Sequence, residues 1–215
     1  MYDCIKELFG ISCPKGFSES EINEVRQLYG RIPYALELYY KEIGREEEVN
    51  NTQNQLVVPY KYAWPKSKNH LIIYAENQGV CFWGISLSDL GVEDPPVHVT
   101  FDNKNKSSWE LESNKLSVFL IAMAHVHAGF ALPFSRNTFF MITESGADII
   151  RSHFKKKCES LLRWVSEGVE FYGNHVCDSI VMIRNAGDYD MCYASGKETC
   201  FNEMCEVLSS LGEEY

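Results

Sequence analysis

The most distinctive chemical groups of this chain are gathered in residues 74–85. Glu76, Asn77 and Gln78 place one carboxylate and two amides side by side, and such groups readily form hydrogen bonds. Two interpretations stand for them: they bond to the backbone of their own turn, or they form a polar spot that a partner recognises. Two interpretations also stand for Trp83, which precedes Gly84, because a tryptophan either packs in a core or anchors an interface. The stretch indicates recognition or a framework role, and it contains no evident catalytic group.

Motifs typical of enzymes and of metal or nucleotide sites are missing from the sequence. There is no glycine-rich dinucleotide or phosphate-binding motif, no Gly-x-Ser-x-Gly elbow and no Cys-x-x-Cys pair. His125 and His127 are two residues apart, which on a helix sends them to different faces. Cys81 lies in an apolar run, which favours a core thiol over a nucleophile. We therefore expect no metal, no cofactor and no enzymatic activity, since a hydrolase would need a pocket with convergent titratable groups.

The chain is acidic, with 30 acidic and 20 basic residues among 215 and a net charge of −10. Nucleic acids and anionic membrane surfaces attract basic proteins, so we expect neither as a partner. A basic protein would suit this charge, although many acidic proteins have no such partner. Glu46, Glu47 and Glu48 are accordingly either a solvated loop or a group that steers association. Residues 1–10 do not resemble a secretory signal and no apolar run could span a membrane, so we expect a cytoplasmic protein with reduced thiols.

Capping residues and apolar periodicity predict the elements that position these groups. Ser18 and Glu21 form a capping box before a helix that ends at Gly30, and Pro33 opens a second helix that ends at Gly44. The next predicted elements are a hairpin (residues 70–75 and 80–85), a strand (97–101) and an apolar helix (114–128) that begins at Ser113 and ends at Gly129.

The second half of the chain continues these patterns without a linker. Ser195-x-Lys197 repeats Ser113-x-Lys115, so a strand-to-helix unit is used twice or the likeness arises by chance. The predicted elements are a strand (138–142), a helix (147–167), strands at 171–172, 179–184 and 191–194 with a turn at Gly187, and a final helix (197–211).

Four segments together resemble the SMI1/KNR4 family, also called the SUKH superfamily. The most specific is the run from Tyr74-Ala75-Glu76-Asn77-Gln78-Gly79 to Trp83-Gly84. The order and spacing of the four agree with that family over residues 18–131. The other three are Gly30-Arg31-Ile32-Pro33 leading to Leu36 and Tyr39-Tyr40, Asp94-Pro95-Pro96-Val97, and Trp109 followed by Ser113 and Phe119-Leu120.

The resemblance implies an α+β fold with a curved, mainly antiparallel sheet and packed helices, and a non-enzymatic role. It implies a family-like core in residues 1–131, on which an α/β extension of residues 132–215 packs. Bacterial members resemble immunity proteins that bind and neutralise polymorphic toxins, many of them nucleases, and fungal members resemble regulators or scaffolds in cell-wall and signalling pathways. A regulatory scaffold of this type would bind housekeeping proteins. We expect an immunity protein whose acidic surface blocks a basic toxin, with the regulatory scaffold as the alternative. The candidate partner-binding residues are Glu46, Glu47, Glu48, Glu76, Asn77, Gln78, Trp83 and Asp94.

Overall fold

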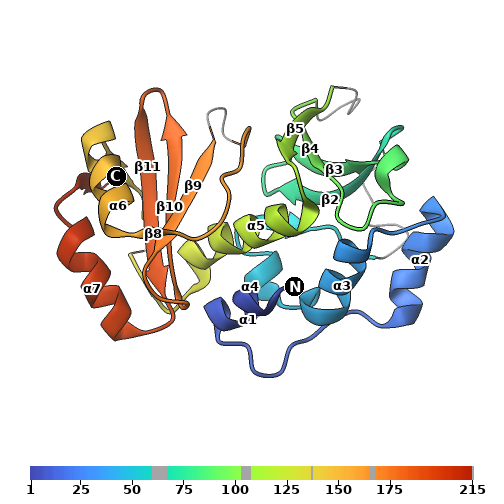
Figure 1. Cartoon of the computed structure of the whole chain (residues 1–215), viewed down its shortest axis with the longest axis horizontal. Coiled ribbons are helices and arrows are strands. Elements are labelled where there is room, and N and C mark those ends of the chain that lie inside the picture. The colour runs from blue at the N-terminus through green and yellow to red at the C-terminus, as the bar shows by residue number, and fades with distance from the viewer. Residues whose placement is uncertain (60–66, 103–107, 137, 165–167, 215) are drawn as a thin grey trace. The chain divides into compact units, whose positions relative to one another are not determined.

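The computed structural model describes residues 1–59, 67–102, 108–136, 138–164 and 168–214 (Figure 1). The predicted α+β class is confirmed, and its antiparallel strands form two sheets. The chain divides into two compact units. Unit 1 contains Met1–Tyr2 and Cys13–Leu120, and unit 2 contains Asp3–Ser12 and Ile121–Tyr215. This division falls inside helix α5 (Leu116–Ala131), whereas the boundary expected from sequence, between residues 131 and 132, falls at the end of that helix.

Unit 1 contains a five-stranded meander in which each strand pairs with the next one along the chain. The predicted hairpin is confirmed as β2 and β3, which pair antiparallel from His70 opposite Ser86 to Ala75 opposite Phe82. The elements of unit 1 are α2 (Glu19–Tyr29), α3 (Tyr34–Ile43), α4 (Glu47–Asn50), β1 (Asn54–Leu56), β2 (His70–Glu76), β3 (Phe82–Ser86), the 3-10 turn η1 (Leu87–Asp89), β4 (Val97–Thr100), β5 (Glu110–Ser113) and the start of α5.

Helices α2 and α3 form where local signals predict them. The Ser18 hydroxyl accepts the N–H of Glu21, and the Glu21 carboxylate accepts the N–H of Ser18 at 2.9 Å, which completes the capping box. Gly30, with φ of 77°, ends α2 in a left-handed conformation that glycine adopts at little cost. Leu28, predicted on the buried face of α2, is 45 % exposed. The predicted buried face of α3 is confirmed for Leu36, Tyr39, Tyr40 and Ile43.

The start of α5 rests on two side chains, of which the sequence indicates only one. The Ser113 hydroxyl accepts the N–H of Lys115 at 3.4 Å, as expected of a residue just before a helix. Asp94, more than twenty residues earlier, accepts the N–H of Ser117 at 2.8 Å and its hydroxyl at 2.6 Å. A free N–H in the first turn of a helix needs an acceptor, and here another segment of unit 1 supplies it.

Unit 2 contains a sheet whose central strands are buried on both faces. Its strand order is β12-β7-β11-β10-β9-β8, with β6 also paired to β11. Figure 1 shows α6 and α7 beside this sheet. The elements of unit 2 are α1 (Asp3–Phe9), the rest of α5, β6 (Phe134–Ser135), β7 (Phe140–Ile142), α6 (Glu144–His153), β8 (Lys155–Lys156), β9 (Val169–Gly173), β10 (Asp178–Asn185), β11 (Asp188–Ser195), α7 (Glu198–Leu208) and β12 (Gly212–Glu214).

The two faces of β10 and β11 have different apolar neighbours. Side chains alternate along a strand, so Ile180 and Met182 pack in a cluster with α6 and α7. On the other face of the sheet, Ala194 packs with Leu8 of α1 and Ala128 of α5. The predicted inner face of the last helix is confirmed, since Met204 and Leu208 belong to the first cluster and Phe201 and Cys205 pack against it. Leu211 also packs there, but α7 ends at Leu208 and not at residue 211 as predicted.

Gly129 has a different role from the one its sequence position indicates. It is predicted to end the apolar helix, but α5 continues to Ala131. A Cβ atom at Gly129 would lie 2.9 Å from Cys192 Sγ and 3.3 Å from Val181 Cγ2. The glycine therefore allows α5 to approach the sheet of unit 2 closely, and the prediction of a helix end there is wrong.

The predicted helix over residues 147–167 is confirmed for residues 147–153, but its length is wrong. Helix α6 ends at His153, and Phe154 is extended. Lys155 pairs with Gly173, and Lys156 pairs with Tyr172, as strand β8 on the edge of the sheet. The sequence has no glycine or proline between residues 147 and 167, so no local signal marks the helix end, and pairing with a distant strand decides it. Residues 165–167 of the predicted helix lie outside the described residues.

Candidate functional site

The polar tip of the β2–β3 hairpin is built around Glu76. One Glu76 carboxylate oxygen accepts the N–H of Gln78 at 2.8 Å and that of Val80 at 3.3 Å, and Gly79 takes a left-handed φ of 71°. The first of the two interpretations therefore describes Glu76, which holds its own turn. The side chains of Asn77 and Gln78 are exposed, so the amides remain on the surface and available to a partner.

Helix α4 lies at the same end of the sheet as this tip. Strand β1, which follows α4, begins with Asn54 opposite Glu76. The Tyr74 hydroxyl in β2 also donates to the Asn50 side-chain oxygen in α4, at 3.4 Å. Four exposed polar residues that are separate in the sequence therefore lie at this end of the sheet. We call them the tip surface: Glu47, Glu48, Asn77 and Gln78.

The three consecutive glutamates differ in their surroundings. Glu46 is partly buried, and its carboxylate accepts the N–H of Lys15 at 2.6 Å. Glu47 and Glu48 are exposed, and Glu47 accepts only the amide of Asn51 at 2.8 Å among the contacts of described residues. Neither carboxylate forms an ion pair with any residue that the structure describes. Two negative charges are therefore presented to solvent at the tip surface.

Trp83 and Gly84 lie on opposite faces of strand β3. The Trp83 indole is fully buried, and its Nε1–H donates to the buried Glu112 carboxylate at 3.1 Å. A partner cannot reach a side chain with no exposed surface, so Trp83 is a core residue and not an interface anchor. On the other face, the Trp109 ring stacks on His70 at 3.9 Å between centroids. A Cβ atom at Gly84 would lie 3.1 Å from that indole, so the missing side chain makes room for Trp109.

Asp94 lies away from the tip surface. Strand β4 begins at Val97 and reaches Thr100 opposite Phe82, so Asp94, which precedes it, is near the other end of the sheet. Both of its carboxylate oxygens are engaged by Ser117. Four of the eight candidate residues, Glu47, Glu48, Asn77 and Gln78, are thus exposed at the same end of the sheet. The other four form contacts within unit 1.

The groups considered for catalysis or metal binding are held in unreactive states. Cys81 is buried, and desolvation raises the pKa of its thiol well above the usual range, so it stays protonated. His125 is buried with Nδ1 3.0 Å from Ser179 Oγ, and burial lowers its pKa to about 3. Within the described ranges, no three histidine, cysteine, aspartate or glutamate side chains gather as a metal site would require.

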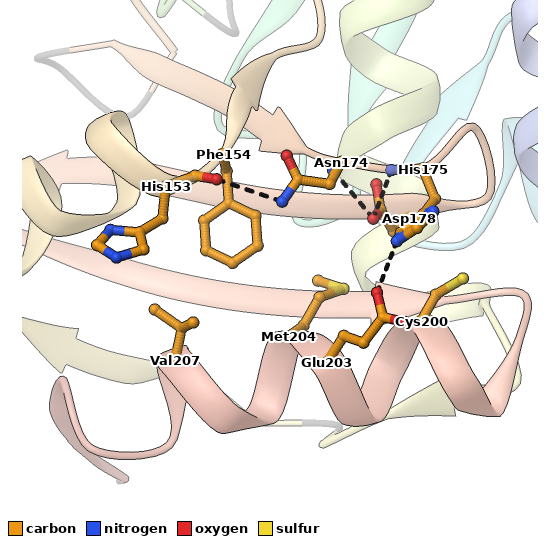
Figure 2. Close-up of a pocket in the computed structure, with 9 residues that line it drawn as sticks. All are labelled: His153, Phe154, Asn174, His175, Asp178, Cys200, Glu203, Met204 and Val207. Carbon is orange, nitrogen blue, oxygen red and sulfur yellow. Dashed lines mark hydrogen bonds and ion pairs between the residues drawn. The ribbon is translucent and has the colours of Figure 1, made fainter.

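A second candidate site, which sequence reasoning missed, is a small cavity of about 120 Å³ in unit 2. Figure 2 shows residues of α6, the β9–β10 turn and α7 around it. Its members come from segments with no shared motif or spacing, so no sequence signal could have joined them. They are His153, Phe154, Asn174, His175, Asp178, Cys200, Glu203, Met204 and Val207.

Asp178 organises this cavity from a fully buried position. One of its carboxylate oxygens accepts the N–H groups of Asn174, at 3.1 Å, and His175, at 2.9 Å. The other lies 3.0 Å from the Lys157 ammonium nitrogen. A Cβ atom at Gly173 would lie 2.1 Å from that same oxygen, so only glycine fits there. The carboxylate is therefore committed to shaping the turn and is not available to a substrate.

The remaining polar groups of the cavity are paired. His175 Nε2 lies 2.8 Å from a Glu203 carboxylate oxygen, and both side chains are exposed. Cys200 lies with its Sγ 3.8 Å from Cys177 Sγ. Desolvation and then the neighbouring Cys177 raise the pKa of the Cys200 thiol, so little thiolate forms at neutral pH.

No protein family, no curated protein and no solved structure matches this chain. Among the helices in the described part of the chain, none has the length and apolarity that crossing a membrane requires.

Proposed function

We propose that this chain is a non-catalytic immunity protein of the SMI1/KNR4 type, which binds a cognate polymorphic toxin domain with nuclease activity and blocks it. The observation that carries the proposal is the tip surface of unit 1. There, the exposed carboxylates of Glu47 and Glu48 stand at the same end of the sheet as the exposed amides of Asn77 and Gln78. The resemblance of residues 18–131 to that family supplies the class of partner.

The chemistry of the tip surface suits a basic protein. A nuclease domain carries lysine and arginine side chains that hold nucleic-acid phosphates. Carboxylates attract the same side chains, and neighbouring amides donate and accept hydrogen bonds that fix the orientation of the complex. Binding there would exclude the nucleic acid by occupying its place. Under this proposal the protein acts in the bacterial cytoplasm.

The test is co-expression of this chain with the toxin domain encoded next to its gene, in a bacterial host that the toxin kills. We expect growth to be restored, and the purified proteins to bind with an association rate that falls as salt is added. Failure to bind the neighbouring toxin and to relieve killing would contradict the proposal. Binding of a housekeeping protein, with no toxin gene nearby, would favour the regulatory scaffold instead.

A matched pair of variants separates the tip surface from the total charge. The double change Glu47→Gln and Glu48→Gln removes two charges there, and we expect an association rate about 3- to 10-fold lower at low salt. The control changes Glu213→Gln and Glu214→Gln, two exposed glutamates of unit 2, and alters the net charge by the same amount. If the two double variants lowered the association rate equally, the proposal that the toxin binds at the tip surface would be contradicted.

A further inference from the structure

Two cysteines of unit 2 are held with their sulfur atoms close together. Cys177 directly precedes β10, and Cys200 is in the first turn of α7, with a distance of 3.8 Å between the two Sγ atoms. The backbone of Cys177 is fixed, since its carbonyl accepts the N–H of Gly196 at 2.7 Å and the hydroxyl of Ser195 at 3.2 Å. A disulfide needs the sulfur atoms about 2.0 Å apart, so a small side-chain rotation would be enough.

The two thiols differ in their access to solvent. Each residue is only 7 % exposed, but Cys200 lines the small cavity and Cys177 does not. Figure 2 shows the Cys200 side chain beside Glu203 at the edge of that cavity. Cys200 is therefore the thiol that borders the cavity, and the Cys177 sulfur lies 3.8 Å from it.

We propose that Cys177 and Cys200 form a reversible disulfide, with a low-molecular-weight disulfide such as oxidised glutathione as the oxidant. The small fraction of Cys200 that is present as thiolate attacks one sulfur of the reagent, breaks its S–S bond and releases the first thiol. The Cys177 thiolate then attacks Cys200 Sγ in the mixed disulfide and releases the second thiol. The protein loses two electrons and two protons, and the reagent gains both as two thiols. This modification site is independent of the proposed toxin binding.

The bond would tie together two segments that shape the cavity. It would join the turn that Asp178 holds to the start of α7, across 23 positions of sequence. Closing a loop of this length restricts the unfolded chain, and we expect the oxidised protein to melt about 5–10 °C higher than the reduced one. The transient formation of such a bond is typical of redox sensing in reducing compartments.

The experiment incubates the full chain with oxidised glutathione, blocks the remaining thiols, and maps the tryptic peptides by mass spectrometry. Trypsin separates the two cysteines, because Arg184 and Lys197 lie between them. We expect a cross-linked pair of peptides, one with Cys177 and one with both Cys200 and Cys205, and the rise in melting temperature with it. Fragment-ion spectra should place the bond at Cys200, and a bond at Cys205 would contradict the proposal. Reaction of the exposed Cys4 or Cys13 without that cross-link would overturn the proposal.

Two single variants test the order of attack, and a third serves as the control. In Cys177→Ser, Cys200 has no resolving thiol, so we expect it to retain one glutathione molecule. In Cys200→Ser, we expect Cys177 to stay unmodified because the cavity does not expose it. Cys13→Ser changes an exposed cysteine of unit 1 and should leave the cross-link intact. Loss of the cross-link in that control would contradict the assignment, as would glutathione on Cys177 in Cys200→Ser.

Discussion

Two aspartates, one in each unit, hold the backbone in very different surroundings. Asp94 in unit 1 is partly exposed and accepts two hydrogen bonds from a single residue at the start of α5. Asp178 in unit 2 has no exposed surface, accepts two backbone N–H groups and lies against the Lys157 ammonium. A carboxylate that water still reaches can lose a partner at modest cost, whereas a buried one depends on all of them. The comparison teaches that desolvation, more than the number of hydrogen bonds, sets the energetic weight of such a residue.

The largest effect is expected from Asp178→Asn. The amide keeps the shape of the side chain but leaves the Lys157 charge without its partner in a largely buried place. We expect the free energy of unfolding to fall by about 3–5 kcal/mol. Urea denaturation measures it, with Asp188→Asn, an exposed aspartate of the same unit, as the control. Equal urea midpoints for Asp178→Asn and Asp188→Asn would show that burial does not make Asp178 more important for stability than an exposed aspartate.

A pH titration tests the same buried environment through His125. Burial lowers its pKa in the folded protein to about 3 from 6.5, and the positive charge of Lys157 adds to this. Between these values the unfolded chain binds more protons, so the free energy of unfolding falls as the pH is lowered. From pH 6.5 to 4.5 we expect a loss of about 2 kcal/mol from this group. His125→Gln should lose correspondingly less over that range, and His153→Gln, an exposed control, should follow the parent protein.

The effect of Asp94→Ala is expected to be smaller. The change removes two hydrogen bonds to Ser117 at the start of α5, and losing a helix cap costs about 1–2 kcal/mol. Asp94→Asn retains an acceptor for the N–H of Ser117, so chemical denaturation should show that it recovers much of the loss. A loss at Asp94 as large as that at Asp178 would show that burial does not decide the difference.

The smallest effects are expected at the two Ser-x-Lys segments that precede α5 and α7. Ser113 and Ser195 each accept the N–H of the lysine two residues on, at 3.4 and 3.2 Å. The Ser113 hydroxyl donates to the nearby Lys115 carbonyl at 3.0 Å, whereas the Ser195 hydroxyl donates to the Cys177 carbonyl at 3.2 Å and so joins two separate segments. We expect Ser113→Ala to cost about 0.5 kcal/mol and Ser195→Ala about 1 kcal/mol. A larger loss of thermal stability in Ser113→Ala than in Ser195→Ala would contradict this prediction.

The parts of the fold that sequence predicted correctly are those with local causes. Ser18 and Glu21 satisfy each other's backbone within four residues. The β10–β11 turn is right because Ala186 and Gly187 both take positive φ, which suits a two-residue hairpin turn. The apolar spacing in the last helix likewise needs no knowledge of the rest of the chain.

The failures have causes that lie elsewhere in the chain. The end of α6 depends on pairing of Lys155 with β9, and the need for Gly129 depends on Cys192 across the helix–sheet contact. In the candidate site, a polar spot at the hairpin tip is one of the two interpretations that the sequence leaves open, and it holds for the exposed amides of Asn77 and Gln78. The position of Glu47 and Glu48 at the same end of the sheet was not predicted, because strand register decides it.

Unit 2 is assembled from both ends of the polypeptide. Leu8, near the N-terminus, fills the apolar layer that Ala128, Leu132 and Ala194 complete. A fragment beginning at residue 121 would therefore lack Leu8 and expose the apolar side chains that it covers. During synthesis α1 can pack in this layer only after more than a hundred further residues have been added, because Ala128, Leu132 and Ala194 follow that far along the chain. A version of unit 2 made on its own should therefore retain residues 3–12, which belong to it, and not begin at residue 121.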